Sequence, residues 1–557
     1  MAVGGFMTVV VAIELLIAGA LVLSYDSGAL WWTALIVAVV LSAMLVAPPG
    51  RTPVARVLSL RFGLWRRRLL RGSEPDGSKP DQAPFDIPVP DETPIGARWD
   101  GTTLVTVLRI DTPPPTIGLL DPSGCTGIAG IPLTALAESV RQFDIELESI
   151  DVISHGIRSH GTGRVAQVYL RTLGPLPATA YRSVLVVLRL DPSRCPEAVA
   201  RRGGGSEGAL RTAIVATRRV ANRIGGRGLS ATALTAAEIT AATTQLAHGA
   251  GAGEGSETWE SVSVGRLHMS TFAVSPDHLA PALDAAWAVP SVSTTVTMAL
   301  RPNPEGDISL RTLVRFNTIT LEPNPAGGHS PIDGLIPLHG RQRAALAASL
   351  PVGAADRLPP IGEHVIDQAA LGRIFLAAAG CGQLIGADHS GRAVAVDLLG
   401  GLPHRISIAG GLHLAQQILL RAIGVGARVL IYSDRPADWQ QFVTAVGDPG
   451  LVALAGGRVF PGHFTVAMCD GLIPTTVDAP TIINLAPPGA HTDPADIRLV
   501  QNHASPQDIW ISTPGGSAMV TMVATGDEIG FIGSSLPSTT GAQAPTRHAS
   551  VGVTPVY

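Results

Sequence analysis

Lysine is almost absent from this sequence, and its scarcity limits the chemistry that the chain can perform. Lys79 is the only lysine, so arginine supplies nearly all of the positive charge. A phosphate-binding loop of the GK[ST] type uses its lysine to hold the β- and γ-phosphates, and the sequence contains no such loop. Charged residues make up 15% of the chain and its net charge is -4, which argues against electrostatic binding of nucleic acid. We therefore expect neither ATP hydrolysis nor a nucleic-acid partner.

Cysteines and recognisable catalytic motifs are also scarce. The four cysteines, Cys125, Cys195, Cys381 and Cys469, lie far apart, and no CxxC or Cys/His pair has zinc-ligand spacing. Free thiols in a reducing cytosol fit this pattern. The sequence has no G-x-S-x-G, HExxH or paired-carboxylate motif. We expect no catalytic residue, no metal and no cofactor, and hence a protein that is not an enzyme.

Long hydrophobic runs occur only in the first 50 residues. Residues 6–24 and 30–48 are each long enough to cross a bilayer, which takes about 20 residues in a helix. Asp26 is the only charge in the connection between them, whereas seven arginines follow at residues 51–71. The positive-inside rule then places the N-terminus and the rest of the chain in the cytoplasm. The sequence predicts a transmembrane helical hairpin over residues 1–50, in a multi-pass protein of the inner (plasma) membrane.

A basic juxtamembrane segment and linker follow at residues 51–95. Apolar and basic residues alternate up to residue 71, which is typical of a helix at the lipid headgroups. Residues 72–95 are rich in Pro, Asp, Gly and Ser, as linkers are. Docking of the basic helix on a neighbouring subunit is the alternative to lipid contact. The predicted lipid contacts are Arg51, Arg56, Arg61, Trp65, Arg66, Arg67, Arg68 and Arg71.

Residues 96–320 have the pattern of a cytoplasmic α+β domain. Alternating apolar residues predict strands at 102–110, 149–154, 164–171, 183–190, 260–275, 293–301 and 308–316. Helical spacing predicts helices at 132–143, 206–225 and 277–288. A linker rich in Pro and Gly, residues 321–361 with a short helix at 341–349, follows the domain.

Residues 362–533 are predicted to form an α/β domain, Rossmann-like or degenerate P-loop-like. A strand at 405–409, a helix at 411–424 and a strand at 427–432 form a βαβ unit. Near-continuous apolar runs in these strands suit a sheet covered on both faces. Further strands are predicted at 464–469, 481–485, 508–512 and 518–524, and a disordered tail at 534–557. The predicted fold class is therefore two N-terminal transmembrane helices, a cytoplasmic α+β domain and this α/β domain.

Two glycine-containing segments of the first domain resemble phosphate loops in their letters. Residues 161–166 (GTGRVA) lie between two predicted strands, which favours a hairpin turn over a dinucleotide site. Arg202, Gly203, Gly204 and Gly205 precede a predicted helix and form a weak candidate for an anion-binding loop. A mobile loop with Ser206 as the helix N-cap is the commoner arrangement.

The second domain leaves an enzymatic alternative open. Gly410 and Gly411 lie between a strand and a helix, where a nucleotide loop would lie, and Asp434 and Asp470 end later apolar strands. A membrane-tethered transferase acting on a nucleotide-linked sugar would use these two carboxylates. A lipid-sensing regulator that works through the arginines of residues 51–71 is the other alternative.

The order of segments in the first domain resembles one protein family. The resemblance is carried by residues 96–101 (GARWDG), 104–110, 143–152, 174–177 (GPLP), 189–191 (RLD) and 202–205. With its two apolar runs and basic flank, the chain resembles EccE, the conserved component E of ESX (type VII) secretion systems, over about residues 1–320. Residues 426–429 and 434–439 are similar to the extension of longer members of that family.

The resemblance implies a structural subunit of an inner-membrane core complex. EccB, EccC and EccD are the partners that it implies, with EccE at the periphery of the complex. EccC supplies the ATPase in that family, which agrees with the missing lysine here. No residue of EccE has a catalytic role to carry over. Trp99 and Trp287 are candidate anchors for contacts between subunits.

Overall fold

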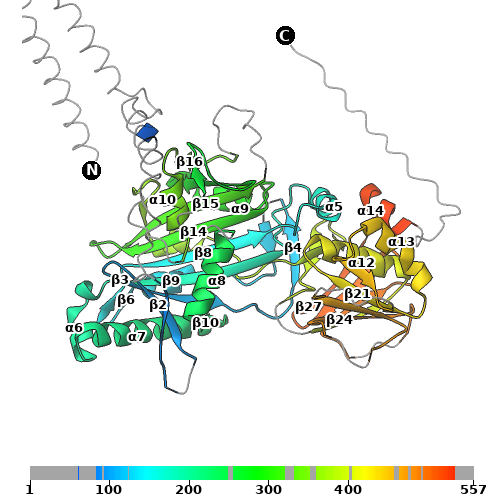
Figure 1. Cartoon of the computed structure of the whole chain (residues 1–557), viewed down its shortest axis with the longest axis horizontal. Coiled ribbons are helices and arrows are strands. Elements are labelled where there is room, and N and C mark those ends of the chain that lie inside the picture. The colour runs from blue at the N-terminus through cyan, green and yellow to red at the C-terminus, as the bar shows by residue number, and fades with distance from the viewer. Residues whose placement is uncertain are drawn as a thin grey trace, which may run out of the picture. The chain divides into compact units, whose positions relative to one another are not determined.

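The structure is a computed structural model that describes residues 60, 61 and 65 and most of residues 83–533 (Figure 1). Within the latter range the description omits residues 91–92, 123, 249–254, 320–330, 352–358, 401–403, 457–462, 475–477, 491–493 and 523. The predicted spans at 6–24 and 30–48 lie outside the described residues, as does the tail at 534–557.

The predicted fold class is wrong for the part of the chain that the structure describes. No helix in these residues combines the length and the apolar character that crossing a membrane requires. Strands dominate instead, in two large sheets whose strand pairs are mostly antiparallel. The described residues therefore show neither a membrane hairpin nor a Rossmann-like domain.

The described chain divides into two compact units, and neither is a continuous stretch of sequence. Unit 1 takes the described residues within 1–113, 129–157 and 182–380, and unit 2 takes those within 114–128, 158–181 and 381–557. Two excursions of the chain, at 114–128 and 158–181, thus leave unit 1 and contribute to unit 2. The sequence predicts two separate domains, residues 96–320 and 362–533, with a linker at 321–361 between them. That division stays a prediction.

Unit 1 is built on a 13-stranded sheet in the order β1-β2-β3-β9-β8-β14-β15-β13-β12-β11, with β10, β16 and β17 beside β3, β13 and β15. The pairs β2–β3, β3–β9, β8–β14, β14–β15 and β13–β15 run antiparallel. The strands are β1 (Phe85–Ile87), β2 (Ile95–Asp100), β3 (Thr103–Ile110), β8 (Ser149–Ile157), β9 (Tyr181–Leu190), β10 (Ala231–Ala233), β11 (Ser256–Glu257), β12 (Val262–Val264), β13 (Leu267–Val274), β14 (Ser293–Pro302), β15 (Ile308–Thr318), β16 (Leu335–Pro337) and β17 (His364–Ile366). The predicted strands at 102–110, 183–190, 293–301 and 308–316 are confirmed.

Apolar side chains cover both faces of this sheet, because they occupy successive positions of the central strands. Leu104 and Leu108 of β3 belong to the core on one face, and Val105 and Val107 belong to the core on the other. Successive side chains of a strand point to opposite faces, so a strand that is apolar at every position must be covered twice.

Helices cover the two faces of the unit 1 sheet (Figure 1). They are α4 (Leu133–Glu138), α6 (Pro196–Arg201), α7 (Gly205–Gly225), α8 (Ala236–Leu246), α9 (Leu279–Ala286), α10 (Gln342–Ala348) and α11 (Gln368–Gly372), with short 3-10 turns at Pro192–Arg194 and Pro276–His278. Helix α7 buries small residues, among them Ala209, Ala213 and Ala216, against the sheet. The Thr217 hydroxyl lies 2.7 Å from that of Thr106 on β3, so a buried hydrogen bond also joins the helix to the sheet.

Unit 2 contains a 12-stranded mixed sheet in the order β22-β21-β23-β24-β20-β25-β26-β27-β18-β19-β4-β5. The pairs from β22 to β25 are parallel, whereas those from β25 to β5 are antiparallel. The strands are β4 (Ile117–Asp121), β5 (Gly124–Thr126), β18 (Gln383–Ala387), β19 (Ala393–Val396), β20 (His404–Ala409), β21 (Val429–Ser433), β22 (Val452–Leu454), β23 (Val466–Asp470), β24 (Thr481–Ala486), β25 (Ile497–Gln501), β26 (Asp508–Thr513) and β27 (Gly516–Thr521). The helices are α5 (Arg164–Leu173), α12 (Leu412–Gly424), α13 (Pro436–Val446) and α14 (Gly526–Ile532).

The prediction of a Rossmann-like or P-loop-like domain for residues 362–533 is wrong because of the antiparallel half of this sheet. The βαβ unit from β20 through α12 to β21 exists. The hairpin of β26 and β27 and the excursion at 114–128, however, extend the sheet with antiparallel strands. Strand β26 alternates buried and exposed residues, as in Ile509 and Trp510, which is the pattern of a strand with one open face. The distant residues 117–126 could not be assigned to this sheet from local pattern alone.

Residues 164–171, predicted as a strand, form helix α5 instead. Val165, Val168 and Tyr169 are buried, and their spacing of three and four residues places them on one face of a helix. Gly163 immediately precedes α5, so residues 161–166 connect a strand to a helix. The predicted hairpin turn at this position is therefore wrong.

A buried ion pair joins two helices of unit 2. Arg421 of α12 donates from Nε to Glu528 Oε1 of α14 at 2.7 Å and from Nη2 to Oε2 at 3.0 Å, and both side chains are buried. Gln417 and the backbone N–H of Thr525 also donate to Glu528 Oε2. Burial alone would raise the pKa of Glu528. The charge of Arg421 and the hydrogen bonds from Arg421, Gln417 and Thr525 lower it by more, so the pKa of Glu528 lies below its usual value.

Glu528→Gln should destabilise unit 2 by about 3 kcal/mol at pH 7, because it leaves the Arg421 guanidinium buried without a counter-charge. A carboxylate whose pKa is lowered on folding stabilises the fold above its unfolded pKa, about 4.3, and loses that effect as pH falls through the folded value. Urea unfolding should therefore show the full difference from wild type at pH 7 and a shrinking one below about pH 4.

The adjacent acid supplies the matched control for this substitution. Asp527 pairs with Arg171 at 3.0 Å, but both side chains are largely exposed. Asp527→Asn should therefore change the unfolding free energy by less than about 1 kcal/mol. Equal effects of the two substitutions would contradict the assignment of Glu528 as a buried charge partner.

Candidate functional site

A tight hairpin in unit 1 carries an unusual turn. Strands β6 (Arg141–Gln142) and β7 (Ile145–Glu146) pair antiparallel, and Phe143 and Asp144 form the connection between them. Phe143 has a φ of 51°, in the left-handed region that favours glycine, and its side chain is fully exposed. The backbone conformation costs roughly 1 kcal/mol relative to glycine. Full exposure also forgoes the 1.5–3 kcal/mol, roughly, that burial of a phenylalanine provides.

The second residue of the turn, Asp144, binds arginines from two helices. Arg202, which follows α6, donates to Asp144 Oδ2 from Nη1 at 2.7 Å and to Oδ1 from Nη2 at 3.3 Å. Arg201 of α6 and Arg219 of α7 each place a guanidinium nitrogen 3.6 Å from the carboxylate. The hydrogen bond from Arg202 is the largest cause that lowers the pKa of Asp144, to about 2. Asp144 is therefore ionised throughout the physiological range.

The glycines after Arg202 reverse the chain between α6 and α7. Gly203, Gly204 and Gly205 have φ values of 110°, 69° and 56°, which other residues rarely adopt. The backbone N–H groups of Gly203 and Gly204 donate to carbonyls of α6, at 3.2 and 2.9 Å. At Gly208, a Cβ would lie 2.3 Å from the carbonyl oxygen of Val199, so only glycine permits this close packing of α6 on α7.

The segment predicted as a weak anion loop is thus placed at this site. Arg202 is bound to Asp144, and the N–H groups of Gly203 and Gly204 are used within the fold. The loop directs Arg202 toward the β6–β7 turn. Binding of an external anion by Arg202, Gly203, Gly204 and Gly205 stays a prediction.

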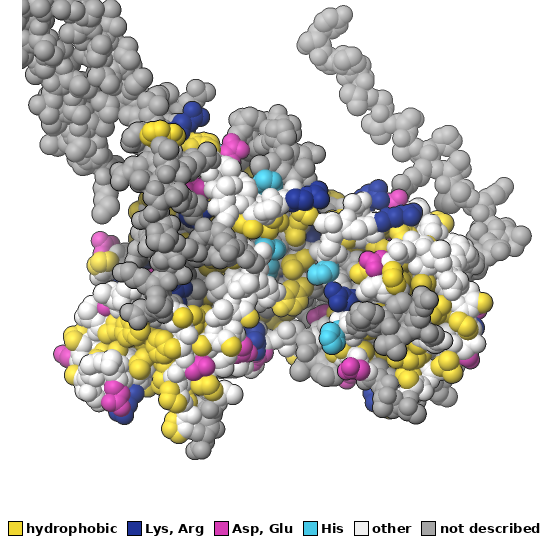
Figure 2. Space-filling view, in the orientation of Figure 1, with side chains coloured by type: hydrophobic (Ala, Val, Ile, Leu, Met, Phe, Trp, Pro, Cys, Tyr) yellow, Lys and Arg dark blue, Asp and Glu magenta, His cyan; other side chains and the backbone are white. Residues whose placement is uncertain are grey.

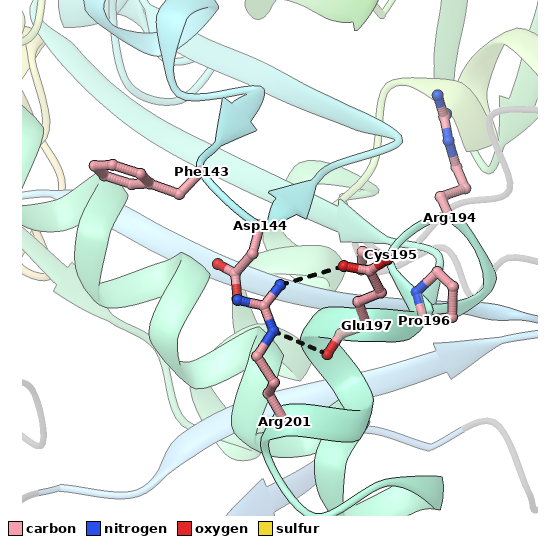
Figure 3. A pocket seen from close by; sticks show the side chains of 7 residues that line it. All are labelled: Phe143, Asp144, Arg194, Cys195, Pro196, Glu197 and Arg201. Carbon is pink, nitrogen blue, oxygen red and sulfur yellow. Dashed lines mark hydrogen bonds and ion pairs between the residues drawn. The ribbon is translucent and has the colours of Figure 1, made fainter.

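Two hollows flank Phe143. The first has a volume of about 580 Å³ and the second about 460 Å³. In the first, Arg201 reaches between Asp144 and Glu197, and the Phe143 ring points away from this group (Figure 3). Figure 2 shows apolar side chains interspersed with charged ones on the face that carries α6 and α7. The first hollow is lined by Phe143, Asp144, Arg194, Cys195, Pro196, Glu197 and Arg201, and the second by Ser139, Arg141, Gln142, Phe143, Arg219, Asn222 and Arg223.

The side chains that line these hollows give little support for catalysis or metal binding there. Burial raises the pKa of the Cys195 thiol, which keeps it protonated and weakly nucleophilic. No cluster of three or more His, Cys, Asp or Glu side chains suited to a metal ion occurs among the described residues. The arrangement suits recognition through an exposed ring and fixed charges.

The nucleotide-type positions of unit 2 make internal contacts. Asp470, at the end of β23, accepts hydrogen bonds from Ser433 Oγ at 2.9 Å, from Arg435 Nε and Nη2 at 2.9 Å each, and from Trp439 Nε1 at 2.8 Å. The Gly411 N–H, at the start of α12, donates to Gln501 Oε1 at 2.8 Å. The Gln501 side chain therefore occupies the donor that a phosphate would use at this position.

Few of the predicted membrane contacts are among the described residues. The Arg61 guanidinium lies 5.4 Å from the ring centroid of Trp259, and the Trp65 side chain is 57% exposed. Arg51, Arg56, Arg66, Arg67, Arg68 and Arg71 lie outside the described residues.

The two tryptophans expected to anchor subunit contacts are not freely exposed. The Trp287 ring is buried, with the Arg182 guanidinium 3.8 Å from its centroid, and Trp99 packs partly buried against the same core. Phe143, which sequence reasoning missed, is the exposed aromatic residue at this site. Its charge partners could not be read from local pattern, because Arg202 lies 58 residues from Asp144 in sequence.

Comparison with known proteins agrees with the family resemblance. Residues 178–274 match the family described as "Putative type VII ESX secretion system translocon, EccE". This match begins just before β9, ends with β13 and includes α6 and α7. Over this stretch the chain is similar to the EccE family.

Curated relatives from mycobacteria share similar parts of the chain. The ESX-5 secretion system protein EccE5 of Mycobacterium marinum is 29% identical over 279 residues, which cover 46% of this chain and 64% of the relative. The ESX-1 secretion system protein EccE1 of Mycolicibacterium smegmatis is 28% identical over 304 residues, 54% of this chain and 59% of the relative. The ESX-2 secretion system protein EccE2 of Mycobacterium tuberculosis is 25% identical over 316 residues, 56% and 55% of the two chains. The chain therefore spans somewhat less than two thirds of the length of these EccE proteins.

Asp144→Asn should destabilise unit 1 by about 2 kcal/mol at pH 7, since it removes a charged hydrogen-bond acceptor. Because folding lowers the pKa of Asp144 from 3.8 to about 2, its contribution is complete above about pH 4 and is lost as pH falls toward 2. Unfolding at pH 7, 5 and 3 measures the difference from wild type, which should narrow only at the lowest pH.

Glu197→Gln is the control, because Glu197 pairs with Arg201 but its side chain is 89% exposed. Its effect should be below about 0.5 kcal/mol at every pH. If Asp144→Asn leaves the unfolding free energy unchanged at pH 7, the arginines do not hold the turn.

Proposed function

We propose that this chain is a structural subunit of the membrane core complex of a type VII (ESX) secretion system. The observation that carries the proposal is the EccE match over residues 178–274, supported by relatives named as ESX secretion system proteins. The matched stretch supplies α6 and α7, and hence the arginines that bind the exposed turn. Subunits of EccB, EccC and EccD type are the proposed partners.

The proposed location is the inner (plasma) membrane, with the N-terminus and both units on the cytoplasmic side. The distribution of arginine supports this orientation, because seven arginines lie in residues 51–71. These arginines and Trp65 are proposed to contact lipid headgroups, where each basic side chain near an anionic surface contributes about 1 kcal/mol.

A non-catalytic role is part of the proposal. The carboxylate of Asp470 is surrounded by donors of its own fold, and Gln501 binds the N–H of Gly411. The absence of GK[ST] from the sequence supports the same view. A transferase using Asp434 and Asp470 gains no support from these contacts.

The full chain, extracted from its own cell membranes in a mild detergent, should migrate on native gels in an assembly many times larger than a monomer. The physical reason is that a structural subunit is held by many contacts at once, which persist when lipid is replaced by mild detergent. Immunoblotting of the native gel against an epitope on the chain measures its migration.

Cells that lack the ATPase component of the same system provide the control. There the large band should disappear or shift to a smaller species, while the amount of chain in the membrane stays similar. Migration of the wild-type chain as a free monomer or dimer in both strains would refute the proposed role.

A further inference from the structure

The Phe143 turn combines two unfavourable features in one residue. Phe143 adopts a left-handed conformation that glycine or asparagine would adopt more easily, and its ring is fully exposed to solvent. Packing within the described fold explains neither feature. A backbone outlier that the surrounding structure holds in place is a reason to look for function at that residue.

The surroundings hold the turn in one conformation. Asp144 is bound by Arg202 at 2.7 Å, and Arg201 and Arg219 lie 3.6 Å from it. These arginines come from α6, its C-terminal end and α7, which pack on one another and on the sheet. An aromatic side chain on a turn that is already rigid loses little conformational freedom on binding, and this is a property of strong anchors in protein interfaces.

The charges near the ring indicate the chemistry of the partner. We call Phe143, Asp144, Arg194, Glu197, Arg201 and Arg219 the Phe143 surface. The Arg219 guanidinium lies 5.7 Å from the Phe143 ring centroid, and Arg194 pairs with Glu146. The linings of the two hollows together hold five arginines and two carboxylates. The arginines stay in excess when their ion-pair partners Glu146 and Glu138 are counted, so the region is complementary to an acidic rim.

We propose that the Phe143 surface docks a partner protein, with the Phe143 ring inserted in an apolar pocket whose rim carries Asp and Glu side chains. This inference rests on the proposed role as a subunit of a larger assembly, and it names the surface that serves that role. The two hollows beside the ring, of about 580 and 460 Å³, receive the edges of the partner's pocket.

A protein partner fits this surface better than an anionic membrane. Asp144 and Glu197 lie among the arginines, and a layer of headgroups sets phosphates against these two carboxylates as well as against the arginines, whereas a folded partner can place its acids opposite the arginines alone. The arginines around Asp144 are also directed at that carboxylate. A complementary protein surface, by contrast, can place a charge opposite each member of a mixed set.

The first arm of the test places a photocrosslinking phenylalanine analogue, p-benzoylphenylalanine, at position 143 of the full chain in its own cells. Phe375, which is 45% exposed in the same unit, is the matched position. After irradiation and mild extraction, position 143 should form an adduct with a second subunit of the same assembly. Mass spectrometry should map that adduct to an apolar segment flanked by Asp or Glu. The yield at position 375 should be at least about 10-fold lower.

The second arm separates binding from folding. Phe143→Gly removes the ring but suits the left-handed backbone, so the melting temperature should stay equal or rise. The fraction of chain in the assembly should fall on the order of 10-fold, as expected for loss of an interface anchor. Val365→Ser, at an exposed apolar residue of the edge strand β17, should leave that fraction unchanged.

The outcomes are distinguishable. If the wild-type chain enters the assembly but position 143 gives no protein adduct, or an adduct with lipid only, this inference is wrong and the proposed function stands. If the wild-type chain enters no assembly, the proposed function itself fails. If Phe143→Gly lowers the melting temperature, its effect on assembly could come from unfolding, and the crosslink at position 143 then decides for or against the inference. An unchanged assembly with Phe143→Gly at full stability also overturns the inference.

Discussion

The ion pairs of Asp144 are the interaction on which the exposed surface of unit 1 depends. A two-residue turn with phenylalanine in a left-handed conformation is unfavourable in isolation. Arg202 binds the carboxylate with two hydrogen bonds, and Arg201 and Arg219 add charge from α6 and α7. Because α7 packs along its small residues on the large antiparallel sheet, the sheet fixes the turn through these arginines.

The other polar groups that suggest chemistry serve the fold in a similar way. The glycines at 203–205 reverse the chain so that Arg202 meets Asp144, and Gln501 binds the N–H of Gly411 in unit 2. Asp470 and Glu528 each accept several hydrogen bonds from neighbouring side chains and backbone. At the β6–β7 turn, by contrast, a fully exposed aromatic ring stands on a backbone that ion pairs hold in place, which is a property of anchors in protein interfaces.

Local pattern predicted the elements whose periodicity is strong. The strands at 102–110 and 183–190 and the helices at 206–225 and 411–424 were predicted because their apolar residues repeat clearly. Residues 164–171 were mistaken for a strand, since a short helix with closely spaced apolar residues also alternates over a few positions. The antiparallel half of the second sheet depends on residues 117–126, and β4 pairs there with residues of β19 that lie more than 270 positions away in sequence, beyond local reasoning. Phe143 was missed for the same reason, because its significance comes from distant arginines and from a backbone angle.

Electron cryomicroscopy of the detergent-extracted assembly tests the central claim most directly. The account predicts density for a neighbouring subunit around the Phe143 ring, with apolar side chains against it and acidic side chains facing Arg194, Arg201 or Arg219. It also predicts that Asp144 keeps its contacts with Arg202 in the assembly. A Phe143 ring that faces solvent or lipid in a complete assembly would contradict the account.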